Sequence, residues 1–134
     1  MRKVFKIAGI ALGGITLFVL IWFGTVVYSF SGHSIEFEAT EFSSLEWKSS
    51  EPEMTWDSLR LKMADDLVEN HIKKGQSKAA VILLLGKPDK TEYFKDYDMV
   101  YYLGRERNPI GIDSEWLVIK LNSDKVESFH IVRD

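Results

Sequence analysis

The sequence predicts an α+β protein, in which an N-terminal transmembrane helix precedes two helices packed on a three- to four-stranded antiparallel sheet. An uncharged apolar run covers residues 7–28, helical periodicity covers 57–72 and 78–85, and period-two alternation dominates after residue 93. The order helix-helix-strand-strand-strand suits a two-layer sandwich. We therefore divide the 134 residues into an anchor at 1–30, an acidic tether at 31–56 and an α+β domain at 57–134.

The apolar run at residues 7–28 predicts a single-pass anchor that contacts the lipid bilayer. A helix of this length rises about 33 Å, close to the roughly 30 Å hydrocarbon core. Arg2, Lys3 and Lys6 precede the run, and the next basic residue is Lys48. The positive-inside rule then predicts a cytoplasmic N-terminus, an extracytoplasmic C-terminal domain and a location in the bacterial inner membrane.

A cleaved signal peptide is the alternative for this segment. Ser29-Phe30-Ser31 offers a small-x-small cleavage pattern. The apolar run is longer than the usual 7–15 residues of a signal peptide, so we expect the anchor to be retained.

The composition excludes some functions and leaves the segment at 31–56 open. The formal net charge of -3 argues against binding nucleic acid, and the absence of cysteine removes thiol catalysis, cysteine zinc sites and N-terminal lipidation. Residues 35–40 alternate as a short strand would, and Phe42 and Trp47 are potential docking side chains. A disordered spacer fits the composition equally well. The segment at 31–56 is acidic, because it has one lysine, Lys48, and six glutamates: Glu36, Glu38, Glu41, Glu46, Glu51 and Glu53.

The second helix carries both of its boundaries in the sequence. Gly75 ends the preceding amphipathic helix, and Ser77 is a favourable N-cap for a helix over residues 78–85. Gly86 suits the left-handed conformation at the C-terminal end, and Pro88 prevents continuation.

Strands are predicted at residues 93–95, 99–103, 115–122 and 125–132. Asp96-Tyr97-Asp98 is a plausible turn between the first two, and Ser123-Asp124 closes a hairpin between the last two. Leu117, Ile119 and Leu121 alternate with their neighbours, so we expect them to face the helices, and Phe129 and Ile131 extend this row.

Two surfaces suit protein contact better than catalysis. The first is the outer sheet face, which is too apolar to stay bare and is covered either by another chain or by residues 33–47. The second is the loop after residue 104, where Arg105 and Arg107 suit anionic groups; a solvated loop without a ligand is the alternative. The side chains expected on the outer face are Trp116, Val118, Val126, His130 and Val132.

Several short motifs occur along residues 42–134: Met63-Ala64-Asp65-Asp66-Leu67, Gly75-Gln-Ser77, Leu84-Leu-Gly86-Lys-Pro88, Tyr102-Leu-Gly104, Gly111-Ile-Asp113 and Trp116-Leu-Val-Ile. In these motifs the chain resembles the SmpA/OmlA, or BamE-like, family of envelope proteins, in a membrane-anchored bacterial branch. The resemblance implies a small accessory or scaffold module that binds another envelope protein. The chain departs from the family in lacking the lipid-carrying cysteine and in having Ala79-Ala80 where a carboxylate is usual.

No catalytic motif is present in the sequence, so we predict a non-catalytic binding module that needs no cofactor or metal. The three histidines fall in three different predicted elements, and Asp65 and Asp66 lie on the polar side of a helix. An inhibitor-like binder of a secreted enzyme, with the related β-lactamase-inhibitor layout, is the alternative function. An enzyme with an unrecognised site is a third hypothesis, opposed by the absence of a convergent polar cluster.

Overall fold

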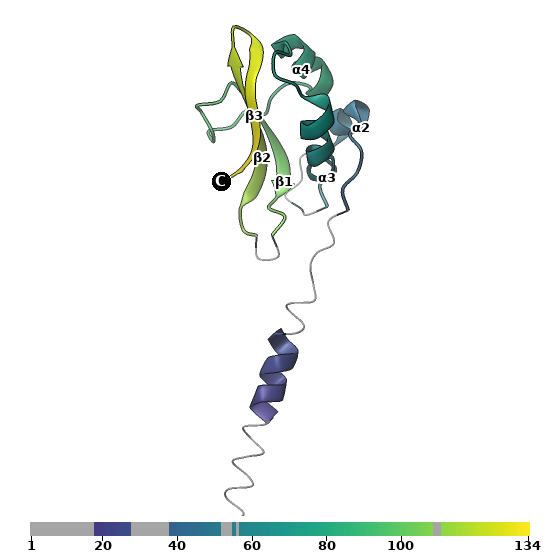
Figure 1. Cartoon of the computed structure of the whole chain (residues 1–134), viewed down its shortest axis with the longest axis vertical. Coiled ribbons are helices and arrows are strands. Elements are labelled where there is room, and N and C mark those ends of the chain that lie inside the picture. Colours follow the sequence, from purple (N-terminus) through teal and green to yellow (C-terminus); the bar gives the residue numbers. More distant parts are fainter. Residues whose placement is uncertain (1–17, 28–37, 52–54, 56, 109–110) are drawn as a thin grey trace, which may run out of the picture. The chain divides into compact units, whose positions relative to one another are not determined.

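The computed structural model describes residues 18–27, 38–51, 55, 57–108 and 111–134. The chain divides into two compact units, Met1–Glu36 and Phe37–Asp134. The second unit is an α+β domain with helices on one side of a three-stranded antiparallel sheet (Figure 1). Its elements are α2 (Ser44–Ser49), α3 (Leu59–Asp66), the π-helical turn η1 (Leu67–His71), α4 (Lys78–Leu85), β1 (Met99–Arg105), β2 (Ser114–Asn122) and β3 (Lys125–Arg133).

The prediction of a transmembrane helix is wrong. Among the described residues, no helix is both long and apolar enough to cross a bilayer. The described helical part of the predicted span is residues 18–27, which corresponds to about 15 Å, half of a hydrocarbon core. The same finding contradicts the predicted single-pass location in the inner membrane. The basic N-terminal residues, residues 7–17 and the Ser29–Ser31 pattern lie outside the described residues.

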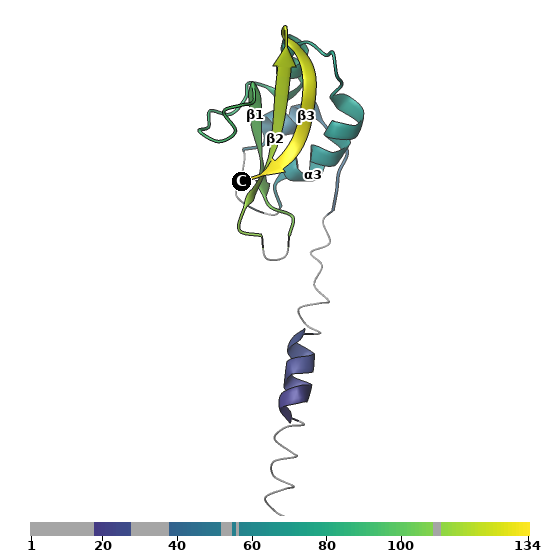
Figure 2. The ribbon, with the colours of Figure 1, turned by 60° about the vertical axis from the view of Figure 1, so that its left-hand side comes forward.

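The sheet has the order β1-β2-β3, and its inner face forms the main core with the helices (Figure 2). Tyr101 pairs with Leu117, which pairs with Ile131, so one apolar row crosses all three strands. The inward orientation predicted for Leu117 and Ile119 is confirmed, since their exposed fractions are 1% and 0%. Val126 also lies in this core and not on the outer face, because the β2–β3 register shifts between Lys120 and Leu121.

Local capping signals place α4 where the sequence predicted it. The Ser77 hydroxyl accepts a hydrogen bond from the Ala80 amide at 3.2 Å. Gly86 ends the helix with φ of 81°, and Gly75 has φ of 83° in the turn before it. A positive φ is thus confirmed at both glycines, and Gly86 ends α4 as predicted. The prediction that Gly75 ends the preceding helix is wrong, because η1 ends at His71 and Ile72 is already extended.

Helix α2 lies inside the segment that the sequence assigned to a tether. Its Trp47 is fully buried against Tyr101, with ring centroids 6.4 Å apart. The Ser44 hydroxyl donates to the Leu84 carbonyl at 2.6 Å, and Lys48 Nζ donates to the Leu83 carbonyl at 3.1 Å. These bonds satisfy carbonyls that the end of α4 leaves unpaired, so α2 acts as a side-chain cap for α4. Residues 38–40 form no strand, and residues 35–37 lie outside the description.

The start of α3 approaches β1 closely at Gly104. The Ser58 hydroxyl donates a hydrogen bond to the Leu103 carbonyl, and the Arg105 amide donates to the Thr55 carbonyl at 3.4 Å. Gly104 has φ of 150°, and a Cβ added there would lie 2.8 Å from the Ser58 Cβ. The β1–β2 register also shifts at this point. A glycine is therefore required both by the backbone and by the approach of α3.

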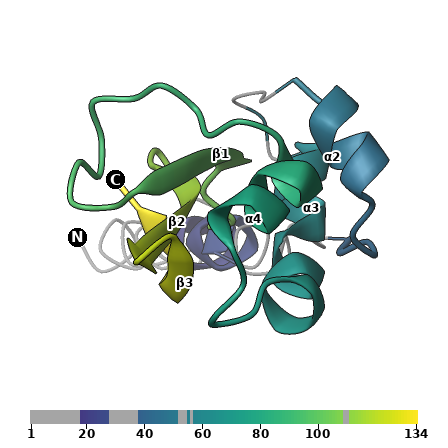
Figure 3. The ribbon, with the colours of Figure 1, turned by 90° about the horizontal axis from the view of Figure 1, so that it is seen from above.

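The segment before β1 is a loop and not the predicted strand and turn. The Asp89 amide donates to the Val100 carbonyl at 2.9 Å, and Asp98 Oδ2 accepts from the Leu121 amide at 2.7 Å. These two bonds attach the ends of the loop to the sheet, and the residues between them run outside it. Figure 3 shows this loop extending to the side of the sheet away from α3 and α4.

Candidate functional site

The outer sheet face is covered by the loop that connects α4 to β1. Trp116 is 8% exposed and Val118 is fully buried. Phe94 and Tyr93 cover the Trp116 ring at centroid distances of 6.0 and 5.7 Å, and Tyr102 of β1 lies at 4.8 Å. We expected residues 33–47 or another chain to cover this face, but the α4–β1 loop covers it instead. Neither Trp116 nor Val118 is therefore accessible to a partner.

A pocket of about 440 Å³ lies within the same loop, lined by residues 88–95, 97, 98 and 100. Its acidic groups already have partners: Asp89 accepts from the Tyr102 amide, Asp98 accepts from the Leu121 amide, and Glu92 pairs with Lys95. The buried indole nitrogen of Trp116 has no hydrogen-bond partner among the described residues, but Trp116 does not line the pocket. The pocket therefore shows no set of convergent polar groups that would define a ligand.

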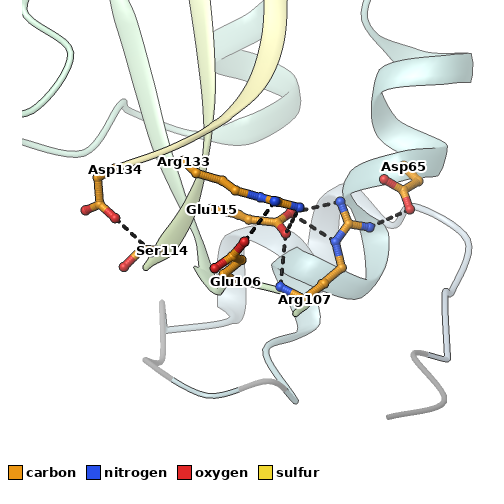
Figure 4. A network of polar contacts seen from close by, with 7 residues as sticks. All are labelled: Asp65, Glu106, Arg107, Ser114, Glu115, Arg133 and Asp134. Carbon is orange, nitrogen blue, oxygen red and sulfur yellow. Dashed lines mark hydrogen bonds and ion pairs between the residues drawn. The ribbon is translucent and has the colours of Figure 1, made fainter. Parts of the chain in front are cut away.

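Ionic contacts join the β1–β2 loop to α3 and β3 (Figure 4). Glu115, with 1% of its side chain exposed, accepts hydrogen bonds from the Arg107 amide at 3.0 Å and from Arg107 Nε at 2.9 Å. Arg107 Nη1 lies 2.6 Å from Asp65, and Arg133 lies 2.8 Å from Glu106 and 3.7 Å from Glu115. These contacts hold the loop onto the domain.

The electrostatics of Arg107 match this structural role. Burial alone would lower the pKa of its guanidinium, but hydrogen bonds to Glu115 and Asp65 raise the pKa overall. Arg107 is thus committed to internal carboxylates. Arg105 donates through Nε to the Gly111 carbonyl at 2.8 Å, which closes the same loop. The prediction that these arginines bind external anions gains no support from this geometry, because both side chains bind the protein itself.

Asp66 attaches the segment before α2 to the end of α3. Its carboxylate accepts from the Phe42 amide at 2.7 Å and from the Asn70 side chain at 2.7 Å, and it lies 3.2 Å from the His71 ring. The bond from Phe42, followed by that from Asn70, lowers the pKa of Asp66 below its ordinary value of 3.8. Asp65 and Asp66 therefore both have defined partners, whereas the sequence suggested a solvated pair.

Acid should weaken the domain through Asp66. Because its folded pKa is lowered, Asp66 stabilises the fold above pH 3.8 and loses this contribution as the pH falls through the lower folded pKa. We expect Asp66→Asn to unfold at lower urea concentration than the wild type at pH 6, and the difference to shrink by pH 3. Urea titrations at the two pH values measure this, and a difference that is independent of pH would contradict the role given to Asp66.

The outer edge of β1 is closed by contacts from the rest of the domain. Near its middle, the Asp89 side chain accepts from the Tyr102 amide at 2.8 Å. Near its end, Thr55 and Ser58 bind the backbone of Arg105 and Leu103. A partner strand could not pair along β1 without displacing these segments.

Among the described residues, the outer edge of β3 has backbone partners at its beginning only. There Val126 exchanges backbone hydrogen bonds with Gly75 and Gln76 at 2.8 and 2.9 Å. Over residues 127–133, β3 pairs with β2 on one side and with no other described strand. We call the free side of residues 127–133 the β3 edge. It holds His130, which is exposed, and Val132, which is half-buried, so these two predicted contact residues lie on an accessible surface.

No group of three or more potential metal-binding side chains occurs among the described residues. Glu115 is the least exposed carboxylate in the ionic contacts between the β1–β2 loop, α3 and β3. Two arginines bind it, so it is closed to a substrate. The geometry therefore provides an accessible strand edge as the site with the clearest binding capacity. Sequence patterns did not reveal this edge, because alternation of apolar residues identifies a strand without identifying which side of it remains unpaired.

The comparisons with known proteins leave this site to be interpreted from its geometry. No family model matches the chain, and neither the curated proteins nor the solved structures produced a match.

Proposed function

We propose that the domain is a non-catalytic protein-binding module that docks an extended segment of a partner along the β3 edge. The observation that carries this proposal is the asymmetry of the sheet, in which β1 is closed by residues 55, 58 and 89 while residues 127–133 pair with no further strand in the described part of the chain. An added strand would satisfy backbone groups that face outward from an edge strand, which is a common mode of peptide recognition.

The side chains of the β3 edge suit such docking. Phe129 and Ile131 are half-buried and pack on the main core, so part of each apolar side chain remains available to a neighbouring strand. Exposed edges are usually protected by charge, proline or covering segments, because they otherwise associate. Here the central residues 128–132 carry no acidic or basic side chain apart from the imidazole of His130.

The resemblance to BamE-like proteins supports a binding or scaffold role and implies that the partner is another envelope protein. That identity stays a prediction, since the chain has no matching family model.

An affinity experiment with matched variants tests the proposed edge. We expect the tagged full chain to retain a partner from extracts of the source cells, and the double variant His130→Lys/Val132→Lys to lose it, because lysines on an edge strand oppose pairing. The control is Leu45→Lys/Leu83→Lys, which replaces two leucines that are 78% and 77% exposed on α2 and α4. Circular dichroism checks that both variants fold.

Loss of the partner in the control variant alone would place the binding surface on the helices and contradict the β3 proposal. Equal retention by both variants, or no retained partner with the wild type, would also contradict it.

A further inference from the structure

We infer that a second copy of this chain fits the β3 edge, in an antiparallel pairing about a twofold axis at His130. This inference rests on the proposed function, because it names one occupant for the same edge. It follows from the register of β3, from the apolar pairs that this register creates and from the opposite charges at the two ends of the edge.

The backbone register defines which groups face outward. The Asp134 amide donates to the Ser114 carbonyl at 3.4 Å, so Asp134 faces β2. Backbone groups of successive strand residues point to alternate sides, so Val132 and His130 also face β2 while Arg133, Ile131 and Phe129 face the open side. A twofold axis at His130 then pairs Phe129 with Ile131 of the second copy, and Ile131 with Phe129, as two hydrogen-bonded pairs.

The same axis joins the apolar rows of the two copies. Phe129 and Ile131 pack against the main core from the inner face of the sheet. Across the axis, Phe129 would contact Ile131 of the second copy, and Ile131 would contact Phe129 of the second copy. The row of apolar side chains on the inner face then continues through the interface. Cross-strand pairs of aromatic and β-branched side chains are favourable contacts. The result is a continuous six-stranded antiparallel sheet built from two three-stranded sheets.

Charge favours the antiparallel over the parallel arrangement. The edge begins at Glu127, an exposed acid, and ends at Arg133, whose side chain remains 56% exposed although it pairs with Glu106. Antiparallel pairing brings the acidic end of one copy beside the basic end of the other, whereas parallel pairing would place like charges together.

The interface is small, so the dimer is expected to be weak. Only residues 127–133 are open, since the turn at 75–76 covers the start of β3. Interfaces well below about 1,000 Å² form transient complexes. We therefore expect the sedimenting mass of the full chain to rise from that of one chain to that of two across roughly 10 μM to 1 mM protein.

Single-cysteine variants test the register directly, because the natural chain has no cysteine. Opposed residues of a non-hydrogen-bonded pair have Cα atoms about 4.5 Å apart, within disulfide range. Under mild oxidation, His130→Cys should form a covalent dimer at least about tenfold faster than Glu127→Cys. In the proposed pairing the two copies of residue 127 are about 20 Å apart, at roughly 3.3 Å per residue.

Equal oxidation rates for the two cysteine variants, or a wild-type chain that stays monomeric throughout the concentration series, would overturn the self-pairing. If the chain is monomeric and the lysine variants of β3 still lose a captured protein, the β3 edge binds a different partner and the proposed function stands. If the dimer forms but the captured protein is lost from the helix variant alone, self-pairing holds and the proposed function fails.

Discussion

Replacing Gly104 with alanine is expected to lower the free energy of unfolding by about 2–4 kcal/mol. Two costs act together at this position. The backbone has φ of 150°, where an L side chain is strained, and the new Cβ would lie 2.8 Å from the Ser58 Cβ and 3.1 Å from the Thr55 carbonyl oxygen. Neither neighbour is the free end of a flexible side chain, so relief requires α3 to move away from β1.

Gly75→Ala is the matched control for Gly104→Ala. Gly75 also has a positive φ, at 83°, but an added Cβ would meet nothing within 4 Å. This variant carries the backbone strain without the clash and should lose only about 1–2 kcal/mol. Urea unfolding of the full chain measures both variants, and equal losses would contradict the close approach of Ser58 to β1.

Replacing Arg107 with methionine should cost about 2–3 kcal/mol, because it removes the guanidinium that pairs with the buried Glu115 carboxylate. The bond from the residue 107 amide to Glu115 survives the substitution, but the bond from Arg107 Nε at 2.9 Å is lost, and Arg133 lies 3.7 Å away. Methionine retains much of the apolar stem of arginine, so most of the loss should come from the unpaired charge.

An exposed ion pair provides the control for Arg107. Lys95 and Glu92 have side chains that are 70% and 89% exposed, so Lys95→Met should change the unfolding free energy by less than about 0.5 kcal/mol. Adding Glu115→Gln to Arg107→Met should recover part of the loss, because it removes the isolated charge. Losses that simply add in the double variant would show that Arg107 and Glu115 are not coupled.

Elements with local signals could be predicted from the sequence. Helix α4 lies between Ser77 and Gly86, whose capping roles depend on their own backbone and the next turn. Strands β2 and β3 follow period-two patterns and flank Ser123-Asp124, where positive φ values close the hairpin. In each case the stabilising contacts lie close in sequence to the residues that signal them.

Elements that depend on distant contacts were missed. Helix α2 is short and polar except for Leu45 and Trp47, and it is held by burial of the Trp47 ring and by bonds to the end of α4. Tyr93 and Phe94 have strand-like propensity, yet they form part of a loop over Trp116. Propensity cannot distinguish an aromatic pair in a strand from one that covers a sheet.

The apolar run at residues 7–28 was predicted to be a transmembrane helix because of its length and its lack of charge. Among the described residues, however, no helix is long and apolar enough to cross a membrane. The alternation of apolar residues predicted only part of the proposed binding site. His130 and Val132 were assigned to a contact surface from alternation, and they lie on the β3 edge. Trp116 and Val118 share that face but are covered by a loop whose path the alternation does not encode.

Residue-resolved amide hydrogen exchange tests the central claim that the β3 edge is the docking surface. The full chain is measured alone at low concentration and again in the complex retained in the affinity experiment. The account predicts that protection increases at the outward-facing amides of Phe129, Ile131 and Arg133 and stays unchanged along β1, which is already closed. Protection that increases on α2, α4 or the loop at 88–98, with the β3 amides unchanged, would contradict the account.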